Sequence, residues 1–267
     1  MSVAATEART VAVWGERLPV RVLVAGRGPA VVFFHGPWGL VWDPFLDGLA
    51  ERFTVYAPEH PGTTPGRADD AYQLDGLWDL VLCYDELLEQ LGLATAALVG
   101  HSFGAMVACE VAAGYPHRAA RLVLIDALGF WRDDAPIVNW MLLGLRELPA
   151  HVLRDPTGPP ARWLFGAGET GEAALATQVR LTWAMGATGK FVWPLPDKGL
   201  GKRIHRVRAP TLLVWGEADR LVPPVYAEEF ARRIPGARVV TVPEAGHAPH
   251  LERTATVLPL VRAFLSA

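Results

Sequence analysis

The pentapeptide Gly-His-Ser-Phe-Gly at positions 100–104 constrains the fold more than any other stretch of this chain. Apolar, strand-like residues at 96–99 precede it, and residues 105–112, which favour a helix, follow it. A turn that joins a strand to a helix this tightly strains its central residue, so small residues are needed two positions before and after it. We therefore expect Ser102 to project at the carboxyl end of a strand, with the Phe103 N–H facing the same space.

Strand-like and helix-like stretches alternate along most of the chain. Residues 10–14 and 18–24 predict an N-terminal hairpin, in which Pro19 favours an edge position. Further strands are expected at 30–34, 53–57, 122–126, 211–216 and 237–242, and further helices at 44–50, 74–91, 224–234 and 253–264. Such alternation predicts an α/β fold, a mostly parallel central sheet with helices on both faces.

Residues 128–206 have a different character, because they contain no strand-like run, several amphipathic helical pieces and half of the 10 tryptophans. We interpret this stretch as a helical cap inserted after a strand. The core domain would then comprise residues 1–127 and 207–267. An insertion at that point lies over the carboxyl ends of the strands, where ligands bind in open α/β sheets.

Composition excludes several classes of partner. The 267 residues are 51% hydrophobic, which can fill a sizeable core, and a net charge of -3 disfavours nucleic acid or an anionic membrane as the main partner. The basic cluster at 202–208 is interpreted as a solvated connector, with an anion-binding edge as the alternative. We expect a small-molecule substrate and leave a homodimer open.

The cysteines and the N-terminus favour a cytoplasmic protein. Cys83 and Cys109, the 2 cysteines of the chain, each fall in an apolar helix-like stretch, where a free buried thiol is expected rather than a disulfide. Residues 1–10 lack the apolar run of a signal peptide, and no window resembles a membrane span.

A serine hydroxyl is a weak nucleophile that needs a base within hydrogen-bond reach, and that base needs an acid to orient it. Asp219 follows the strand expected at 211–216, and His247 follows the strand expected at 237–242. The order Ser, Asp, His along the chain is the one expected for this architecture. Glu217 and Asp126 also follow strands, and Asp126 is the reserve candidate for the acid.

The other histidines receive lesser roles. His250 competes with His247 for the base, but it begins to run into the last helix and is interpreted as structural. A metal site built on these two histidines is disfavoured, because no third ligand is visible, and no cofactor is expected. His35 and His101 are interpreted as groups that fix loops, and His60 receives no role.

The sequence resembles the α/β-hydrolase fold superfamily, in the serine-nucleophile branch with a helical cap. The resemblance covers essentially the whole chain and is carried by four motifs in order: the His35-Gly36 turn, positions 100–104, positions 215–223 and positions 246–252. Relatives that open epoxides or displace halide carry Asp at the central position of the second motif, where this chain has serine, so those activities are set aside.

The resemblance implies roles for individual residues. Ser102 would be the nucleophile, His247 the general base and then acid, and Asp219 the residue that orients His247. Phe103 N–H would be one donor of the oxyanion hole.

Related proteins supply the second donor from the residue after the His-Gly turn, but here that residue is Pro37, which has no N–H. We favour the Trp38 N–H as the donor. A weaker oxyanion hole, or a reaction without a full oxyanion, remains as an alternative.

These features predict a serine hydrolase that cleaves a carboxylic ester or lactone of an apolar or aromatic small molecule through an acyl-serine intermediate. Candidate substrate-binding residues are Pro37, Trp131, Trp140 and Trp183, although the tryptophans could simply pack the cap on the core. A carbon-carbon bond hydrolase of the same fold ranks lower, because the first loop and the elbow differ from those enzymes. A non-hydrolytic ligand-binding or cyclising member is the third possibility, supported by Pro37.

Overall fold

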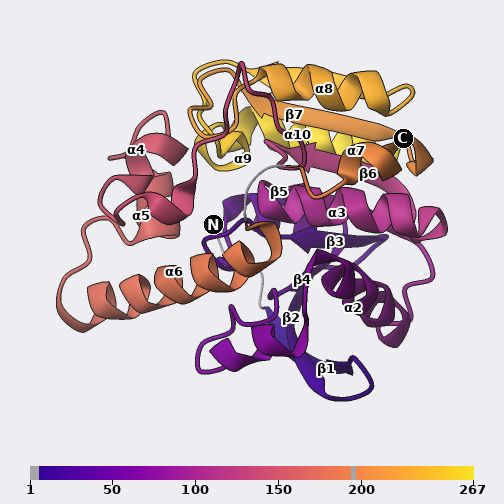
Figure 1. Ribbon diagram of the computed structural model, residues 1–267, viewed down its shortest axis with the longest axis horizontal. Helices are drawn as coiled ribbons and strands as arrows, with labels where there is room; N and C mark the ends of the chain where they lie inside the picture. Colours follow the sequence, from indigo (N-terminus) through magenta and orange to yellow (C-terminus); the bar gives the residue numbers. More distant parts are fainter. Residues whose placement is uncertain (1–5, 194–196) are drawn as a thin grey trace.

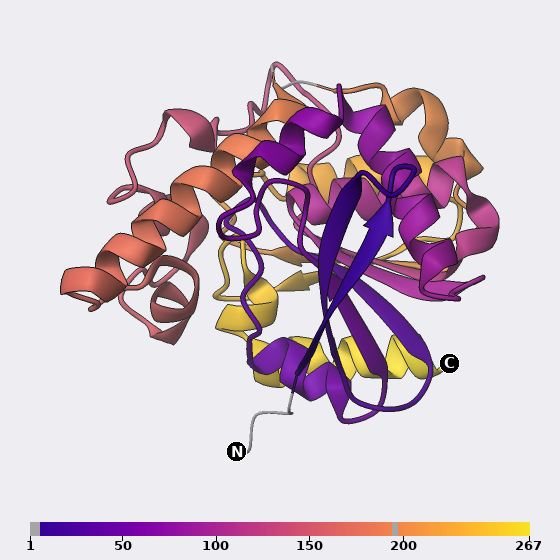
Figure 2. The same ribbon diagram turned by 90° about the horizontal axis from the view of Figure 1, so that it is seen from below.

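Eight strands form one twisted sheet at the centre of the computed structural model, which describes residues 6–193 and 197–267 (Figures 1 and 2). The strands are β1 (Glu7–Val13), β2 (Leu18–Ala25), β3 (Ala30–Phe34), β4 (Thr54–Pro58), β5 (Ala96–His101), β6 (Ala119–Ile125), β7 (Thr211–Gly216) and β8 (Arg238–Val242). Their order is β1-β2-β4-β3-β5-β6-β7-β8. The pairs β1–β2 and β2–β4 are antiparallel and the others are parallel, which confirms the mostly parallel sheet.

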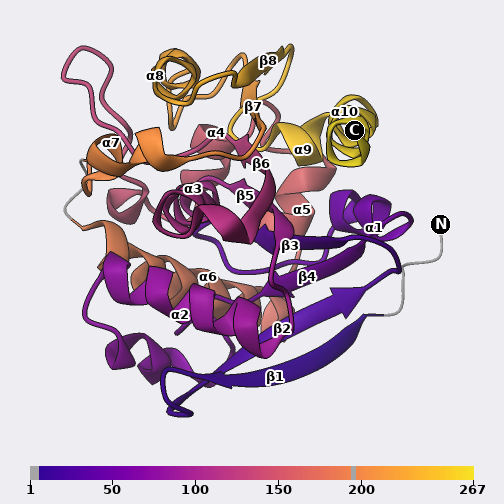
Figure 3. The same ribbon diagram turned by 90° about the vertical axis from the view of Figure 1, so that its right-hand side faces the viewer.

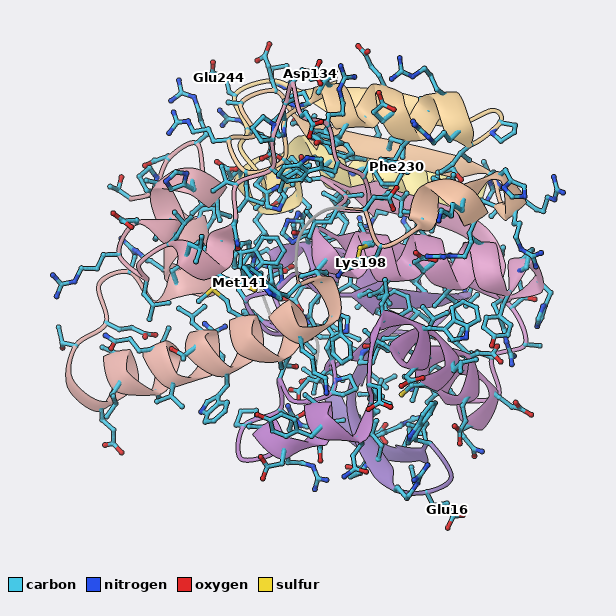
Figure 4. The ribbon with its side chains drawn as sticks, viewed as in Figure 1. Glu16, Asp134, Met141, Lys198, Phe230 and Glu244 are labelled. Carbon is cyan, nitrogen blue, oxygen red and sulfur yellow. The ribbon has the colours of Figure 1, made fainter. Side chains whose placement is uncertain are left out.

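Helices cover both faces of the sheet, as predicted. They are α1 (Pro44–Ala50), α2 (Leu77–Gln90), α3 (Phe103–Gly114), α8 (Val225–Arg233), α9 (Pro249–Glu252) and α10 (Thr254–Ser266), with short 3-10 helices η1 (Ala68–Gln73) and η2 (Pro116–Arg118). Figure 3 shows α2 and α3 on one face and α1 and α10 on the other. Phe230, labelled in Figure 4, fixes α8 by packing 4.6 Å from the ring of Phe130 and 6.1 Å from that of Trp215.

The interior strands of the sheet are buried along nearly their whole length, because neighbouring strands and helices cover them, whereas the edge strand β8 is mostly exposed. All six residues of β7 are buried, as are four of the five residues of β3. Apolar runs of this kind are typical of interior strands of a parallel sheet. The loops at their carboxyl ends therefore start from fixed positions.

The chain between β6 and β7 forms helices and loops throughout its described residues. The helices are η3 (Trp140–Leu142), α4 (Leu148–Val152), α5 (Pro159–Phe165), α6 (Gly171–Val192), α7 (Leu200–Arg203) and η4 (Ile204–Arg206). In Figure 1, α4, α5 and α6 stand together beside the sheet, whereas α7 lies against α3. Met141, labelled in Figure 4, packs against α6 so closely that a Cβ at Gly189 would lie 2.5 Å from its Sδ.

The basic cluster is not simply a solvated connector, so that interpretation is wrong for two of its arginines. Arg203 donates to both carboxylate oxygens of the buried Glu110 on α3, at 2.8 and 2.6 Å. Arg206 donates to the carbonyl of Ala113 at 2.8 Å. These contacts exist because α7 and η4 return the chain to the core along α3.

Pro19 does not mark an edge strand, which corrects that expectation. β2 lies between β1 and β4. However, β4 pairs only with residues 22–25 of β2, so Pro19, opposite Ala12 of β1, lies beyond the end of that ladder. The missing N–H of a proline therefore removes no hydrogen bond to β4.

Cys83 and Cys109 are free and buried, as predicted. Burial raises the pKa of the Cys83 thiol to about 12 and that of Cys109 well above its usual value. No helix among the described residues combines the length and apolarity needed to cross a bilayer. Residues 1–5, part of the stretch assessed for a signal peptide, lie outside the described residues, and the cytoplasmic location stays a prediction.

Candidate active site

Ser102 stands on the strained turn between β5 and α3. Its backbone angles are φ 56° and ψ -117°, a conformation that non-glycine residues rarely adopt. The turn is possible because its flanking residues have no side chain: a Cβ at Gly100 would lie 2.4 Å from the Gly104 carbonyl oxygen, and one at Gly104 would lie 2.1 Å from that of Phe34. The strand-turn-helix arrangement expected from the pentapeptide is therefore present.

The loops after β5, β7 and β8 bring three of the predicted side chains into one hydrogen-bonded chain. The hydroxyl of Ser102 lies 2.8 Å from His247 Nε2, and His247 Nδ1 lies 2.7 Å from Asp219 Oδ2. An ionised carboxylate only accepts, so Nδ1 carries the proton and Nε2 is free to accept from the serine hydroxyl. The other oxygen of Asp219 accepts the N–H groups of Leu221 and Val222 at 2.8 and 2.9 Å.

The two alternative acids have different surroundings. Glu217 is exposed, whereas Asp126 is fully buried beside this chain. A carboxylate oxygen of Asp126, one of Asp219 and a ring nitrogen of His247 lie within 4.8 Å of one another, a grouping that could in principle hold a metal ion. Since Nδ1 of His247 already donates to Asp219, the group is organised as hydrogen-bond partners rather than as free ligands.

The backbone around His247 is held from three directions. His101 donates from Nε2 to the His247 carbonyl at 2.6 Å, so it fixes a loop as predicted. The His247 N–H donates to the Val152 carbonyl of α4 at 2.7 Å. Glu252 accepts the N–H of Gly246 at 2.8 Å and that of Arg154 at 2.7 Å. Apart from the place of Glu252 in the last motif, nothing in the sequence indicated this role.

His35 and His60 form a buried network behind the first loop. His35 donates from Nδ1 to the Gly36 carbonyl at 2.7 Å and accepts the His60 N–H at Nε2. His60 donates from Nε2 to the His35 carbonyl at 2.9 Å and accepts the hydroxyl of Tyr84 at Nδ1. Burial lowers the pKa of His60 to about 4 and that of His35 well below its usual value, so both rings are neutral. His60, which the sequence left without a role, thus anchors this loop.

Phe103 and Trp38, the predicted oxyanion donors, both lie close to the Ser102 turn. Phe103 is fully buried and is the first residue of α3, where backbone N–H groups lack intrahelical partners. Trp38 is 1% exposed, and its ring stands edge-on to that of His247 with 6.4 Å between centroids. Pro37 is buried beside it in the same loop.

Two segments of the cap region cover this loop. Phe165 of α5 packs edge-on against Trp38 at 5.8 Å. Arg180 of α6 donates to the Trp38 carbonyl at 2.7 Å and to the Leu164 carbonyl at 2.8 Å. Ser102 and His247 themselves are fully buried.

The structure places the three candidate tryptophans in different surroundings. Trp140 is fully buried, and Trp131 donates its indole N–H to Asp133 at 2.8 Å. Trp183 is 54% exposed and lines an outer groove of about 890 Å³ between α6 and residues 63–69, whose lining includes neither Ser102 nor His247. A substrate-binding role for these residues stays a prediction.

His250 lies apart from the hydrogen-bonded chain. It is buried between the rings of Phe45, 5.3 Å away, and His101, 4.5 Å away. Burial, with a smaller contribution from His247, lowers the pKa of His250 to about 3. These surroundings fit its interpretation as a structural residue.

The fold and the strand-turn-helix serine define the class of protein. A family model described as the alpha/beta hydrolase fold matches residues 29–254, and the chain belongs to this family. The polyketide synthase ThaQ of Burkholderia thailandensis is 31% identical over 91% of this chain, which spans only 12% of that synthase. A poly(3-hydroxyalkanoate) depolymerase of Ectopseudomonas oleovorans is 29% identical over 83% of this chain and 78% of its own length.

Solved structures support the same assignment of fold. A membrane phospholipase A superimposes with a TM-score of 0.81 at 20% identity, covering 99% of this chain and 87% of the other. At this identity the likeness concerns the fold alone. Membership of the alpha/beta hydrolase family supports a hydrolase.

Proposed function

We propose that this protein is a serine hydrolase that cleaves a carboxylic ester or lactone of an apolar small molecule through an acyl-Ser102 intermediate. The observation that carries the proposal is the hydrogen-bonded chain from Ser102 through His247 to Asp219, built on a strained strand-to-helix turn. A nucleophile, its base and an acid that orients the base are the parts that such acyl transfer requires.

In the first half of the reaction, His247 Nε2 takes the proton of Ser102 as Oγ attacks the carbonyl carbon. The negative charge of Asp219 stabilises the imidazolium that forms. His247 then gives this proton to the leaving alkoxide, and the acyl group stays on Ser102. In the second half, His247 takes a proton from water as the water oxygen attacks the acyl carbon, and it returns that proton to Ser102 Oγ when the acyl–Ser102 bond breaks and the acid is released.

The tetrahedral intermediate needs N–H donors for its oxyanion. Phe103 N–H, at the amino end of α3, is the first donor, and the helix dipole adds to its effect. We assign the second to the Trp38 N–H, because Pro37 has none. Arg180 and the His35–His60 network hold the loop that carries it.

The surroundings of Ser102 favour an apolar acyl group. Phe103 stacks on Phe191 of α6 with 6.4 Å between centroids, and Trp38 stands against His247. Arg180, the cation of α6 that contacts the Trp38 loop, is already bound to two carbonyl groups. An anionic substrate would therefore find little stabilisation there.

The test uses a fluorophosphonate probe and a panel of nitrophenyl esters, lactones and a dienoate with a cleavable carbon-carbon bond. We expect labelling at Ser102 and turnover of esters or lactones with short apolar acyl groups. Ser102→Ala should abolish both, while the matched control Ser266→Ala at the end of α10 should change neither. Absence of labelling, or turnover unchanged in Ser102→Ala, would refute the proposal. Selective cleavage of the dienoate would instead assign carbon-carbon bond hydrolysis to this site.

A further inference from the structure

Asp126 is fully buried beside Asp219 and His247, yet the mechanism above gives it no part. It follows β6 directly with φ 45°, and its N–H donates to the Val214 carbonyl at 3.0 Å. Its Oδ1 accepts the N–H of Gly216 at 2.9 Å, whereas its buried Oδ2 has no hydrogen-bond partner among the described residues. A carboxyl oxygen buried in this way is costly, so its environment requires an explanation.

The explanation lies in the neighbouring acid. Oxygens of Asp126 and Asp219 lie within 4.8 Å of each other, together with a ring nitrogen of His247. All three side chains are shielded from water. Two carboxylates this close in such surroundings cannot both ionise without strong repulsion, so the pair holds one proton at neutral pH.

The hydrogen bonds decide where that proton is. The carboxylate of Asp219 accepts three N–H groups, from Leu221, Val222 and His247. That of Asp126 accepts one, from Gly216. Because N–H donors stabilise the charged form, Asp219 keeps the charge and Asp126 keeps the proton.

The other ionisable groups around Asp126 also favour its protonated form. Burial first, and then the charge of Asp219, raise the pKa of Asp126 well above its usual value, and Glu252 adds to the effect. His101 and His250, which pack near His247, have pKa values lowered by burial and so carry no positive charge that would favour an ionised Asp126.

We propose that Asp126 is a protonated positioning residue, whose carboxyl group faces Asp219 and donates its proton in a hydrogen bond to that carboxylate. The bond would hold Asp219 in line with His247. It would also limit the negative charge beside the imidazole to a single unit. This inference rests on the proposed function, because it treats Asp219 as the acid that orients His247.

The kinetic test compares Asp126→Asn, Asp126→Ala and the matched control Asp219→Asn. An asparagine copies a neutral carboxyl group, so Asp126→Asn should keep kcat/KM within about threefold and leave the acid limb of its pH profile in place. Asp126→Ala removes the donor to Asp219 and should lower kcat by about tenfold or more. The same amide change at the ionised acid, Asp219→Asn, should cost roughly 10⁴-fold, because it favours the wrong imidazole tautomer.

An acid limb that moves by one pH unit or more in Asp126→Asn would show that Asp126 carries charge, and would overturn the proposal. A measurement that needs no turnover separates failure of the Asp126 proposal from failure of the proposed function. The infrared difference spectrum between wild type and Asp126→Asn at pH 7 should contain the carbonyl stretch of a protonated carboxyl group. A difference limited to carboxylate bands would contradict the proposal, whatever the substrate proves to be.

Discussion

Pro37 and Trp38 lie in the first loop, beside His247. Proline has no N–H to donate, while Trp38 is buried against the ring of His247 and Arg180 holds its carbonyl. The tight turn also limits the neighbouring position, since a Cβ at Gly36 would lie 2.9 Å from His101 Nδ1. At the scale of single residues, the loop is thus fixed by sterics on one side and by a hydrogen bond on the other.

Pro37→Ala tests whether position 37 needs a donor. If the Trp38 N–H already serves the oxyanion, adding an N–H at position 37 should change kcat by less than about threefold, whereas one missing donor is worth roughly 10²–10³-fold. The measurement is kcat on the best nitrophenyl ester, with Ser102 labelling as the control for an intact site. A rise in kcat of tenfold or more would show that the wild-type oxyanion hole lacks a donor.

At the scale of elements, α6 connects the cap region to the first loop. Its Arg180 joins Trp38 to Leu164 of α5, and burial lowers the pKa of the guanidinium, which nevertheless remains charged. α4 supplies the Val152 carbonyl to the His247 loop. The helices between β6 and β7 therefore hold the backbone of both loops, and we expect them also to close the site.

Arg180→Ala should separate these two effects. Loss of two charge-assisted hydrogen bonds should lower the free energy of unfolding by about 2 kcal/mol, or the Tm by about 4–8 °C. A less fixed Trp38 loop should lower kcat by about tenfold. Labelling of Ser102 by a bulky fluorophosphonate should instead become faster, because the covering segments open more readily.

The matched control for this variant is Arg162→Ala, which removes an exposed arginine of α5. Calorimetry and labelling kinetics provide the two readouts. Equal labelling rates for wild type and Arg180→Ala would contradict a closing role for α6.

At the scale of the whole molecule, the buried histidines couple folding to pH. His35, His60, His101 and His250 are all buried, and burial is the largest cause of the lowered pKa of each. At these four positions the unfolded chain therefore binds more protons than the folded one below pH 6.5. The stability that these four histidines contribute is complete above that pH and is lost as the pH falls toward 4 and then 3.

His250→Leu should reduce this acid sensitivity, because leucine has a similar volume and cannot be protonated. With a pKa of about 3 when folded and 6.5 as its ordinary value, His250 lowers the free energy of unfolding by about 2 kcal/mol between pH 7 and pH 5. Urea titrations of wild type and His250→Leu at both pH values should show that this part of the loss in unfolding free energy disappears in the variant. His117→Leu on the surface is the control, and an unchanged loss in His250→Leu would refute the assignment.

The alternation of apolar runs and helical periodicities was enough to predict the parallel sheet and its helical faces, because both depend on short stretches of the chain. The same is true of the Ser102 turn, where Gly100 and Gly104 are required by contacts only a few residues away in sequence or across one strand. The order of strands was not predictable locally: Pro19 suggested an edge, but pairing with β4 decides the place of β2.

The sequence by itself determined the fold class and named Ser102, Asp219 and His247 as candidates that each follow a strand. Only the tertiary structure decided their surroundings: that His60 anchors the first loop, that Arg180 binds the Trp38 carbonyl of that loop, and that Asp126 lies beside Asp219. The physical reason is the sequence separation over which each kind of interaction acts. Turn sterics and strand patterns act between near neighbours, whereas these contacts join residues 25 to 142 positions apart and exist only once the sheet and its inserted helices have packed together.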